Sequence, residues 1–586
     1  MQHLELCVWM VVMVAGCESL TAGTCADQSP KVVSTSQGKV SGILEKSVSG
    51  KIFWSYYGIP YAKPPLGQLR LRDPLPAEPW SGIRNGSVEF ESQPCLQVPF
   101  RVAVEGIKLK PQQLVGTEDC LYLNVFRPTV ASFKQLPVMV YIHGGGFLAG
   151  GSVEYEPHVL LDHDIVLVVL QYRVGVMGFL STEDSVIPGN FGLKDQTMAF
   201  RWVQNNIHNF GGDPNSVTIF GESAGGASVH HHILSPKSQG LFHRAIMQSG
   251  TAISTFGVGT GHRQVAEQVG VSMGCDTSLG SSHLLACLQT LDARNLSATL
   301  QNFFEWFISP LAFKPRVDGD FIPAQPAQLL KDRQYKAVDI LSGNTHNEGY
   351  LVGYPLYIEK NLQESLLNNF SYVGPLSLIC CEGSSDPLSI TKRVYTYYLG
   401  GLNFSFETQK DQIIQMFGEY HLQVPQDFTE VLHYHNDPSK KVFAYELVHR
   451  GQLSQGDFFV PLLSNHYVTH GDDLYYLFRG GPFLQPVPSI PGRPYDLQRE
   501  VDLRVRHFIT TMWTNFATYG NPTPDNSLGF IWEPVSENFH HLAITSTPKM
   551  ISNKRKKSGD FLKTLPTLQN FILFPDKVTS TVIKAV

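Results

Sequence analysis

Short runs of apolar, largely β-branched residues recur along the chain and predict strands that are buried on both faces of a sheet. Two longer segments, residues 193–207 and 499–516, instead place their apolar side chains on one face at helical spacing. Strands that alternate with helices predict an α/β fold, in which helices cover both faces of a large, mostly parallel central sheet. The predicted strands are residues 138–142, 165–171, 217–220, 245–248, 338–341 and 442–447.

Residues 32–43 and 53–57 show a different pattern, which is typical of antiparallel strands, and we expect them to form an N-terminal antiparallel edge. No break in composition and no internal repeat divides the chain. We therefore expect a single domain over residues 24–586.

The first residues of the chain predict a secretory signal peptide. Residues 4–15 are strongly apolar, and small residues follow at 21–24, which places the signal peptide at residues 1–23 with cleavage between 16 and 24. Two alternatives are a membrane anchor, for which the apolar run is too short, and a bacterial lipidation site ending at Cys17. No other stretch is long and apolar enough for a stable membrane span.

Composition narrows the function. With 42% hydrophobic and 16% charged residues among 586, the chain is globular, and its net charge of −6 argues against a nucleic-acid partner. The only tight cationic cluster, residues 554–557, is expected to be a solvated or protease-sensitive loop. The sequence predicts no oligomeric state.

Cysteines and glycosylation motifs agree with secretion. Cys95 with Cys120, and Cys275 with Cys287, are spaced for local loops in an oxidising compartment, whereas Cys380 and Cys381 have no evident partners. The C-terminus lacks a retention signal of the His-x-Glu-Leu type, so we expect release from the cell. Four Asn-x-Ser triplets would be glycosylation acceptors, at Asn85, Asn295, Asn369 and Asn403.

The sharpest chemical signal is a Gly-x-Ser-x-Gly motif around Ser223. A predicted strand runs directly into Gly221-Glu222-Ser223-Ala224-Gly225, and small residues able to begin a helix follow. Glycines permit a tight strand-to-helix turn that presents the serine hydroxyl above the sheet, at the positive end of a helix. We therefore predict that Ser223 is a nucleophile rather than only a helix cap.

A second glycine-rich segment predicts an oxyanion hole. The strand at residues 138–142 ends in His143-Gly144-Gly145-Gly146, where backbone N–H groups can approach a substrate oxygen without a Cβ atom in the way. Together with the N–H of Ala224 they would supply three donors. His143 itself is predicted to be structural, and the run His230-His231-His232 is not expected to bind metal, because consecutive helical residues point in different directions.

A serine nucleophile needs a base and a carboxylate that orients the base. Glu348 follows the strand at residues 338–341 and lies where an acid is wanted. The chain has 21 histidines, so the base is ambiguous from spacing alone. The downstream candidates are His470, His421, His433, His435 and His466.

From Phe53 to its C-terminal region the chain resembles the type-B carboxylesterases of the carboxylesterase/cholinesterase family, which have the α/β-hydrolase fold. The resemblance rests on many ordered motifs. They include Glu118-Asp119-Cys120-Leu121, Gln171-Tyr172-Arg173, Gly189-Asn190-Phe191-Gly192, Asn209-Phe210-Gly211-Gly212-Asp213-Pro214, Gly221 to Gly225, Asn347-Glu348-Gly349 and His470-Gly471-Asp472.

The resemblance implies specific roles for the candidate residues. It implies a triad of Ser223, Glu348 and His470, an oxyanion hole formed by Gly145, Gly146 and Ala224, and disulfides Cys95–Cys120 and Cys275–Cys287. Glu222 and Ser249 are implied to lie beside the triad. The implied chemistry is hydrolysis of a small carboxylic ester without a metal or organic cofactor.

Other members of such families define the alternatives. Some have lost the nucleophile and act in adhesion or binding, but here all three triad positions are present. Cholinesterases expect an aromatic cation site, usually a Trp, in the first disulfide loop, whereas Phe100 is the only aromatic residue between Cys95 and Cys120. Juvenile-hormone esterases typically have Gln before the nucleophile, where this chain has Glu222. An uncharged ester remains the expected substrate.

Overall fold

The computed structural model describes residues 31–87, 93–99, 107–129, 134–379, 384, 386–459, 466–480 and 494–579. The predicted signal peptide, Phe100, Cys380 and Cys381 lie outside these residues.

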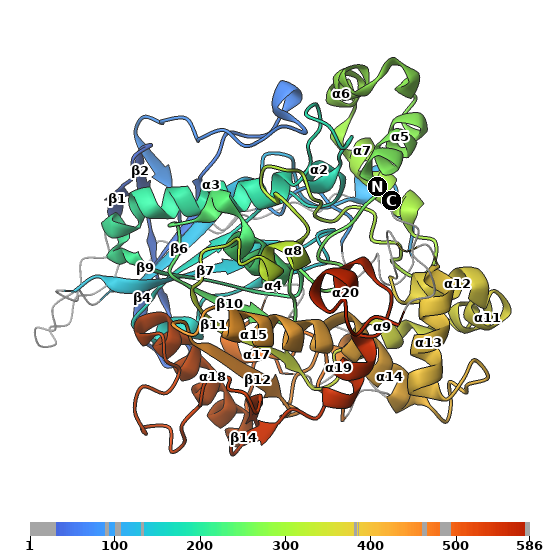
Figure 1. Cartoon of the computed structure of the whole chain (residues 1–586). Coiled ribbons are helices and arrows are strands. Elements are labelled where there is room, and N and C mark those ends of the chain that lie inside the picture. The colour runs from blue at the N-terminus through green and yellow to red at the C-terminus, as the bar shows by residue number, and fades with distance from the viewer. Residues whose placement is uncertain are drawn as a thin grey trace, which may run out of the picture.

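An eleven-stranded mixed sheet crosses the molecule, with the order β14-β13-β12-β11-β10-β9-β7-β8-β6-β4-β3 (Figure 1). All six predicted strands belong to it. The strands are β3 (Ile43–Lys46), β4 (Ile52–Pro60), β6 (Tyr122–Pro128), β7 (Leu136–Ile142), β8 (Val166–Leu170), β9 (Gly212–Glu222), β10 (Arg244–Gln248), β11 (Asp339–Thr345), β12 (Val442–Leu447), β13 (His540–Ile544) and β14 (Lys549–Ser552).

The centre of the sheet is parallel and its two ends are antiparallel. In the spatial order of the sheet, the seven strands β8, β7, β9, β10, β11, β12 and β13 are parallel to their neighbours within this group. At one end β6, β4 and β3 follow in antiparallel pairs, and at the other end β14 is antiparallel to β13. The predicted α/β-hydrolase arrangement with an N-terminal antiparallel edge is therefore confirmed. The N-terminal stretch also forms a small second sheet of β1 (Val32–Ser34), β2 (Lys39–Ser41) and β5 (Ile83–Asn85).

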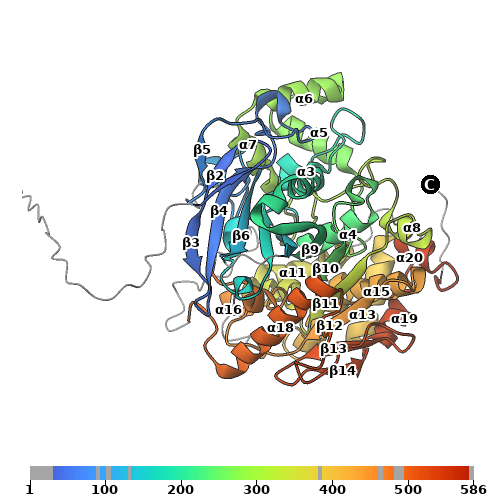
Figure 2. The same cartoon turned by 90° about the vertical axis from the view of Figure 1, so that its left-hand side faces the viewer.

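Both faces of the central sheet are buried, as the unbroken apolar runs predict. Val138, Val140 and Ile142 of β7 pack with α3 (Phe191–Asn206) in one core, while Met139 and Tyr141 of the same strand pack with α18 (Glu500–Tyr519) in another. Figure 2 shows α3 and α18 on opposite sides of the sheet. The predicted helices at residues 193–207 and 499–516 correspond to these two elements.

A further group of helices follows β11 and packs around its own apolar core (Figure 1). Within the described part of the chain, no helix is both long and apolar enough to cross a membrane.

The remaining helices are α2 (Gly175–Phe179), α4 (Ala224–Leu234), α5 (His262–Ser272), α6 (Ser281–Thr290), α7 (Ala293–Ala298), α8 (Pro326–Lys331), α9 (Tyr350–Gly353), α10 (Pro355–Ile358), α11 (Lys360–Asn368), α12 (Phe370–Ser377), α13 (Pro387–Leu399), α14 (Lys410–Gly418), a π-helix (Glu419–Gln423), α15 (Val424–Asn436), α16 (Gly456–Phe459), α17 (Leu474–Leu477), α19 (Lys556–Leu562) and α20 (Leu568–Leu573).

Candidate active site

Ser223 occupies a strained turn between β9 and α4. Its φ of 59° and ψ of −122° lie outside the regions that most residues adopt, and its N–H donates to the carbonyl of Gln248 at 2.8 Å. A Cβ atom on Gly225 would lie 2.1 Å from the carbonyl oxygen of Ile142, so only glycine fits there. The turn places Ser223 at the N-terminus of α4, where the helix dipole favours negative charge.

Glu348 and His470 are in direct contact. Glu348 lies three residues beyond β11 and is completely buried, and its Oε2 is 2.6 Å from Nδ1 of His470. Its Oε1 accepts hydrogen bonds from the Ser249 hydroxyl and the Thr345 N–H, both at 2.6 Å. These contacts fix the carboxylate so that it can orient the imidazole.

The other candidate histidines make different contacts. His421 Nδ1 is 2.8 Å from the Thr255 hydroxyl, and His433 Nε2 is 3.1 Å from Nε2 of His230. His435 is exposed and lies 3.9 Å from Glu537, and the ring of His466 packs on Tyr467. Of the five candidates, only His470 contacts a buried carboxylate beside the serine turn.

The outer nitrogen of His470 contacts Glu222, the residue before the serine. Nε2 lies 3.0 Å from Glu222 Oε1, and within the described residues no hydrogen bond joins His470 to the Ser223 hydroxyl. Burial raises the pKa of Glu222 to about 8. Burial lowers the pKa of His470, but the charges of Glu222 and Glu348 outweigh that effect and raise it to about 9.

The loop that carries His470 is held by buried polar groups whose roles the sequence did not predict. Asp472 accepts from the backbone N–H groups of Thr469 and Gln455, both at 2.8 Å. Burial raises the pKa of Asp472 to about 7 and also raises that of Asp473. Asp473 Oδ2 accepts from Gln248 Nε2 and the Tyr445 hydroxyl, each at 2.8 Å. The available sequence signal was the pair of acidic residues, Asp472 and Asp473, that follows His470 after one glycine.

The glycine-rich loop after β7 lies against the serine turn. A Cβ atom on Gly144 would be 2.8 Å from Glu222 Oε2 and 3.1 Å from Ser223 Cβ. Gly145 and Gly146 adopt φ angles of 106° and 64°, which favour glycine. Within the described residues, the N–H groups of Gly145, Gly146 and Ala224 donate to no protein acceptor. Three donors are thus available beside the serine.

His143 does not have the environment of a base. It is fully buried, stacks on Tyr172 with ring centroids 4.2 Å apart, and has a pKa that burial lowers to about 4. The run at residues 230–232 likewise packs inward, where its rings contact His433, the Gly257 carbonyl and two polar side chains. No group of three metal-ligand side chains occurs among the described residues.

The structure contains both expected disulfides, Cys95–Cys120 and Cys275–Cys287. All four candidate glycosylation asparagines, Asn85, Asn295, Asn369 and Asn403, are exposed.

Comparison with known proteins identifies the class that this fold and site define. The model of the carboxylesterase family matches residues 29–562, and the chain belongs to that family. It is 36% identical to a juvenile hormone esterase of Tribolium castaneum, over 86% of each chain. It is 33% identical to venom carboxylesterase-6 of Apis mellifera, over 93% of this chain and 95% of the relative, and 33% identical to carboxylesterase 1E of Mus musculus, over 95% and 97%. The protein is a carboxylic-ester hydrolase.

Proposed function

We propose that the protein is a secreted serine esterase that hydrolyses uncharged carboxylic esters through Ser223, His470 and Glu348. The observation that carries this proposal is the 2.6 Å contact between His470 Nδ1 and Glu348 Oε2, at the sheet edge where Ser223 sits in its strained turn. This is the arrangement of base and orienting acid that a serine nucleophile requires.

The reaction would proceed in two steps. His470 Nε2 accepts the Ser223 proton as Oγ attacks the ester carbonyl, and Glu348 stabilises the imidazolium that forms. The imidazolium then gives its proton to the departing alcohol. Water, deprotonated by the same nitrogen, hydrolyses the acyl-enzyme and releases the carboxylic acid. The proton that His470 takes in each half is returned, so the site is regenerated.

The three free N–H groups of Gly145, Gly146 and Ala224 would hold the oxyanion. A preorganised donor of this kind is worth about 3 kcal/mol in the transition state, which corresponds to a factor of about 10² in rate. Their position beside the serine turn therefore supports acyl transfer over a binding or adhesion role.

Buried carboxyl groups disfavour an anionic substrate. Glu222 and Asp473 both lie near His470, and their ionised forms would repel an anion. The relatives do not select one ester, because proteins named for juvenile hormone and for fatty acyl-CoA are 36% and 32% identical to this chain.

Secretion rests on the predicted signal peptide, two disulfides and four exposed acceptor asparagines. Expression in a eukaryotic secretory host tests it. We expect active protein in the medium, with a mass that falls on enzymatic removal of N-glycans. Retention inside the cell without glycans would contradict secretion.

The catalytic proposal is tested by hydrolysis of p-nitrophenyl acetate with matched variants. Ser223→Ala is expected to reduce kcat by about 10⁶, and His470→Gln by several orders of magnitude, with unchanged melting temperatures. The Glu348→Gln variant should fold but have a reduced kcat, because a neutral amide does not stabilise the positively charged imidazolium of His470. A folded wild-type protein without turnover would instead support the non-catalytic, adhesion-type alternative.

A further inference from the structure

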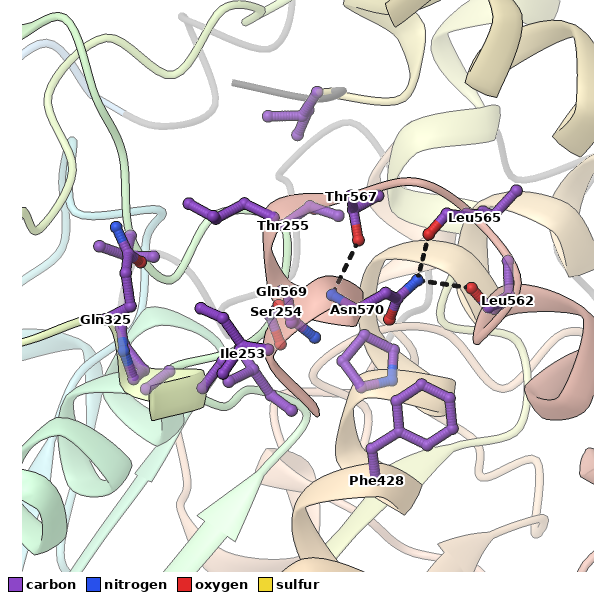
Figure 3. Close-up of a pocket in the computed structure, with 18 of the residues that line it drawn as sticks. Ile253, Ser254, Thr255, Gln325, Phe428, Leu562, Leu565, Thr567, Gln569 and Asn570 are labelled. Atoms are coloured by element: carbon purple, nitrogen blue, oxygen red, sulfur yellow. Dashed lines mark hydrogen bonds between the residues drawn. The ribbon is translucent and has the colours of Figure 1, made fainter. Parts of the chain in front are cut away.

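A second cavity, of about 160 Å³, lies apart from the candidate catalytic residues. It opens partly to solvent and is lined by the loop after β10 at residues 252–260, the start of α8, α15 and the C-terminal helices α19 and α20 (Figure 3). Ser223, Glu348, His470 and the oxyanion glycines are not among the residues that line it. The cavity is therefore distinct from the site described above.

The walls are apolar, with a few uncharged polar groups. Ile253, Phe428, Leu562 and Leu565 present hydrocarbon to the cavity, and hydroxyl and amide side chains complete the lining. Among the described residues that line the cavity, Lys314 alone has a formal charge, and it is buried and has contacts within the chain. A neutral ligand with a hydrocarbon body fits such walls.

One polar side chain points to the functional group of that ligand. Asn570 is only 5% exposed, and its Nδ2 donates to the carbonyl oxygens of Leu562 and Leu565 at 2.7 and 3.0 Å. Figure 3 shows that its carboxamide oxygen is directed away from these carbonyls, and within the described residues no donor reaches that oxygen. This oxygen keeps accessible surface, so the O–H group of a ligand can donate a hydrogen bond to it.

We propose that this cavity is a binding site for a small aliphatic alcohol, with its hydroxyl on Asn570 and its chain against Ile253 and Phe428. The size agrees, since an engineered apolar cavity of about 150 Å³ holds one benzene molecule. Alcohols are the class of product that ester hydrolysis releases, and this link alone rests on the proposed function.

One side chain links the helical segment that lines this cavity to the turn that carries Glu348, the candidate acid. Tyr420 of the π-helix and Val424 of α15 line the cavity. Between them along the chain, Gln423 Nε2 donates to the carbonyls of Thr345 and His346 at 3.1 and 3.2 Å, in the turn that carries Glu348. π-Helical turns are frequent at functional sites. A bound alcohol would therefore contact the element that supports the catalytic turn.

The test is ligand-observed ¹⁹F NMR with 6,6,6-trifluorohexan-1-ol, on protein with and without organophosphate treatment. We expect binding in both samples and at least a tenfold weaker Kd in Ala327→Phe, because Ala327 of α8 lines the cavity and the ring fills it. Gln328→Phe places the same ring on the next residue, which does not line the cavity, and should bind like wild type. Leu568→Trp, at an exposed lining position, provides a second blocking variant if Ala327→Phe does not fold.

Three results would overturn the proposal. They are no binding to wild-type protein, equal binding to wild-type and both blocking variants, or tighter binding of 6,6,6-trifluorohexanoate than of the alcohol, which would make Lys314 the anchor. None of these readouts depends on ester turnover. Failure of the alcohol site and failure of the esterase proposal are thus separate outcomes.

Discussion

Replacing Glu222 with Gln is expected to move the pH dependence of catalysis toward acid. His470 acts as a base only when it is neutral, and Glu222 Oε1, 3.0 Å from Nε2, stabilises its charged form. Gln keeps the size of the side chain and removes its charge. The change should therefore lower the pKa of His470 and enlarge the neutral, active fraction at low pH.

The magnitude follows from the contact. Two unit charges 3.0 Å apart interact by about 5 kcal/mol at an effective dielectric constant of about 20. Because Glu222 itself has a pKa of about 8 and carries its charge only in part near neutrality, the full interaction is not expressed. An opposite charge at short range typically moves a pKa by about 1–3 units. From the wild-type pKa of about 9, a fall of about 2 units would raise the neutral fraction at pH 7 from about 1% to about half.

The assay is kcat/KM for a neutral p-nitrophenyl ester between pH 5 and pH 10, because this ratio reports groups of the free enzyme. The quantity to compare is the pH at the midpoint of the acid side of the profile, which reports the pKa of His470. The value of kcat/KM on the alkaline plateau does not enter this comparison. Glu222→Asp keeps the charge and is the matched control, whose midpoint should stay near that of the wild type. Melting temperatures of both variants check the fold.

An acid limb in Glu222→Gln within about 0.3 unit of the wild-type midpoint would refute the reasoning. It would mean that Glu222 does not control the charge of His470, and that the 3.0 Å contact is not maintained in solution. A shift to higher pH would contradict the electrostatic sign itself.

Three further predictions concern stability. Arg555 is buried and forms ion pairs with Asp427 at 2.8 Å and with Glu446 at 2.6 Å, so Arg555→Ala should lower the free energy of unfolding by about 3–5 kcal/mol in denaturant titrations. The neighbouring Lys556 is exposed, and Lys556→Ala should change that free energy by less than about 0.5 kcal/mol. Equal effects of the two substitutions would refute the buried ion pairs. Burial opposes protonation of His158, but Glu156 and Glu45 raise its pKa to about 9. The decrease in melting temperature caused by His158→Gln should therefore be largest below about pH 6.5 and should disappear as the pH rises past about 9. A decrease that does not change with pH would contradict this prediction. Replacing Cys275 and Cys287 by Ser removes a cross-link across 12 residues and should cost about 3 kcal/mol by thermal unfolding, with no change in a reducing buffer where the wild type has already lost the bond.

Much of the fold could be predicted because its pattern is local. The six predicted strands carry apolar residues on both faces, and parallel strands buried under helices require that composition. Strands β6, β13 and β14 were not predicted from pattern. Their residues mix apolar, aromatic and polar types, and their pairing is decided by partners elsewhere in the sheet.

The site shows the same division. The serine turn could be predicted because its motif is local, although its two glycines are also needed for the close approach of Ile142 on β7. The contact of Asp473 with Gln248 joins positions 225 residues apart, and that of Trp513 with Gln248 joins positions 265 apart. No local pattern indicates such contacts. The expected solvated loop at residues 554–557 was wrong for Arg555, because Asp427 and Glu446 lie far away in sequence and hold it in the interior.

The central claim, that Ser223 is the nucleophile, is tested most directly by covalent labelling. Protein treated with a radiolabelled or mass-tagged organophosphate is digested, and the modified residue is located by mass spectrometry. The account predicts one equivalent of adduct on Ser223, labelling that slows strongly in His470→Gln, and no adduct in Ser223→Ala. Ester hydrolysis that persists in Ser223→Ala, or an adduct on a different residue that accounts for the lost activity, would contradict it.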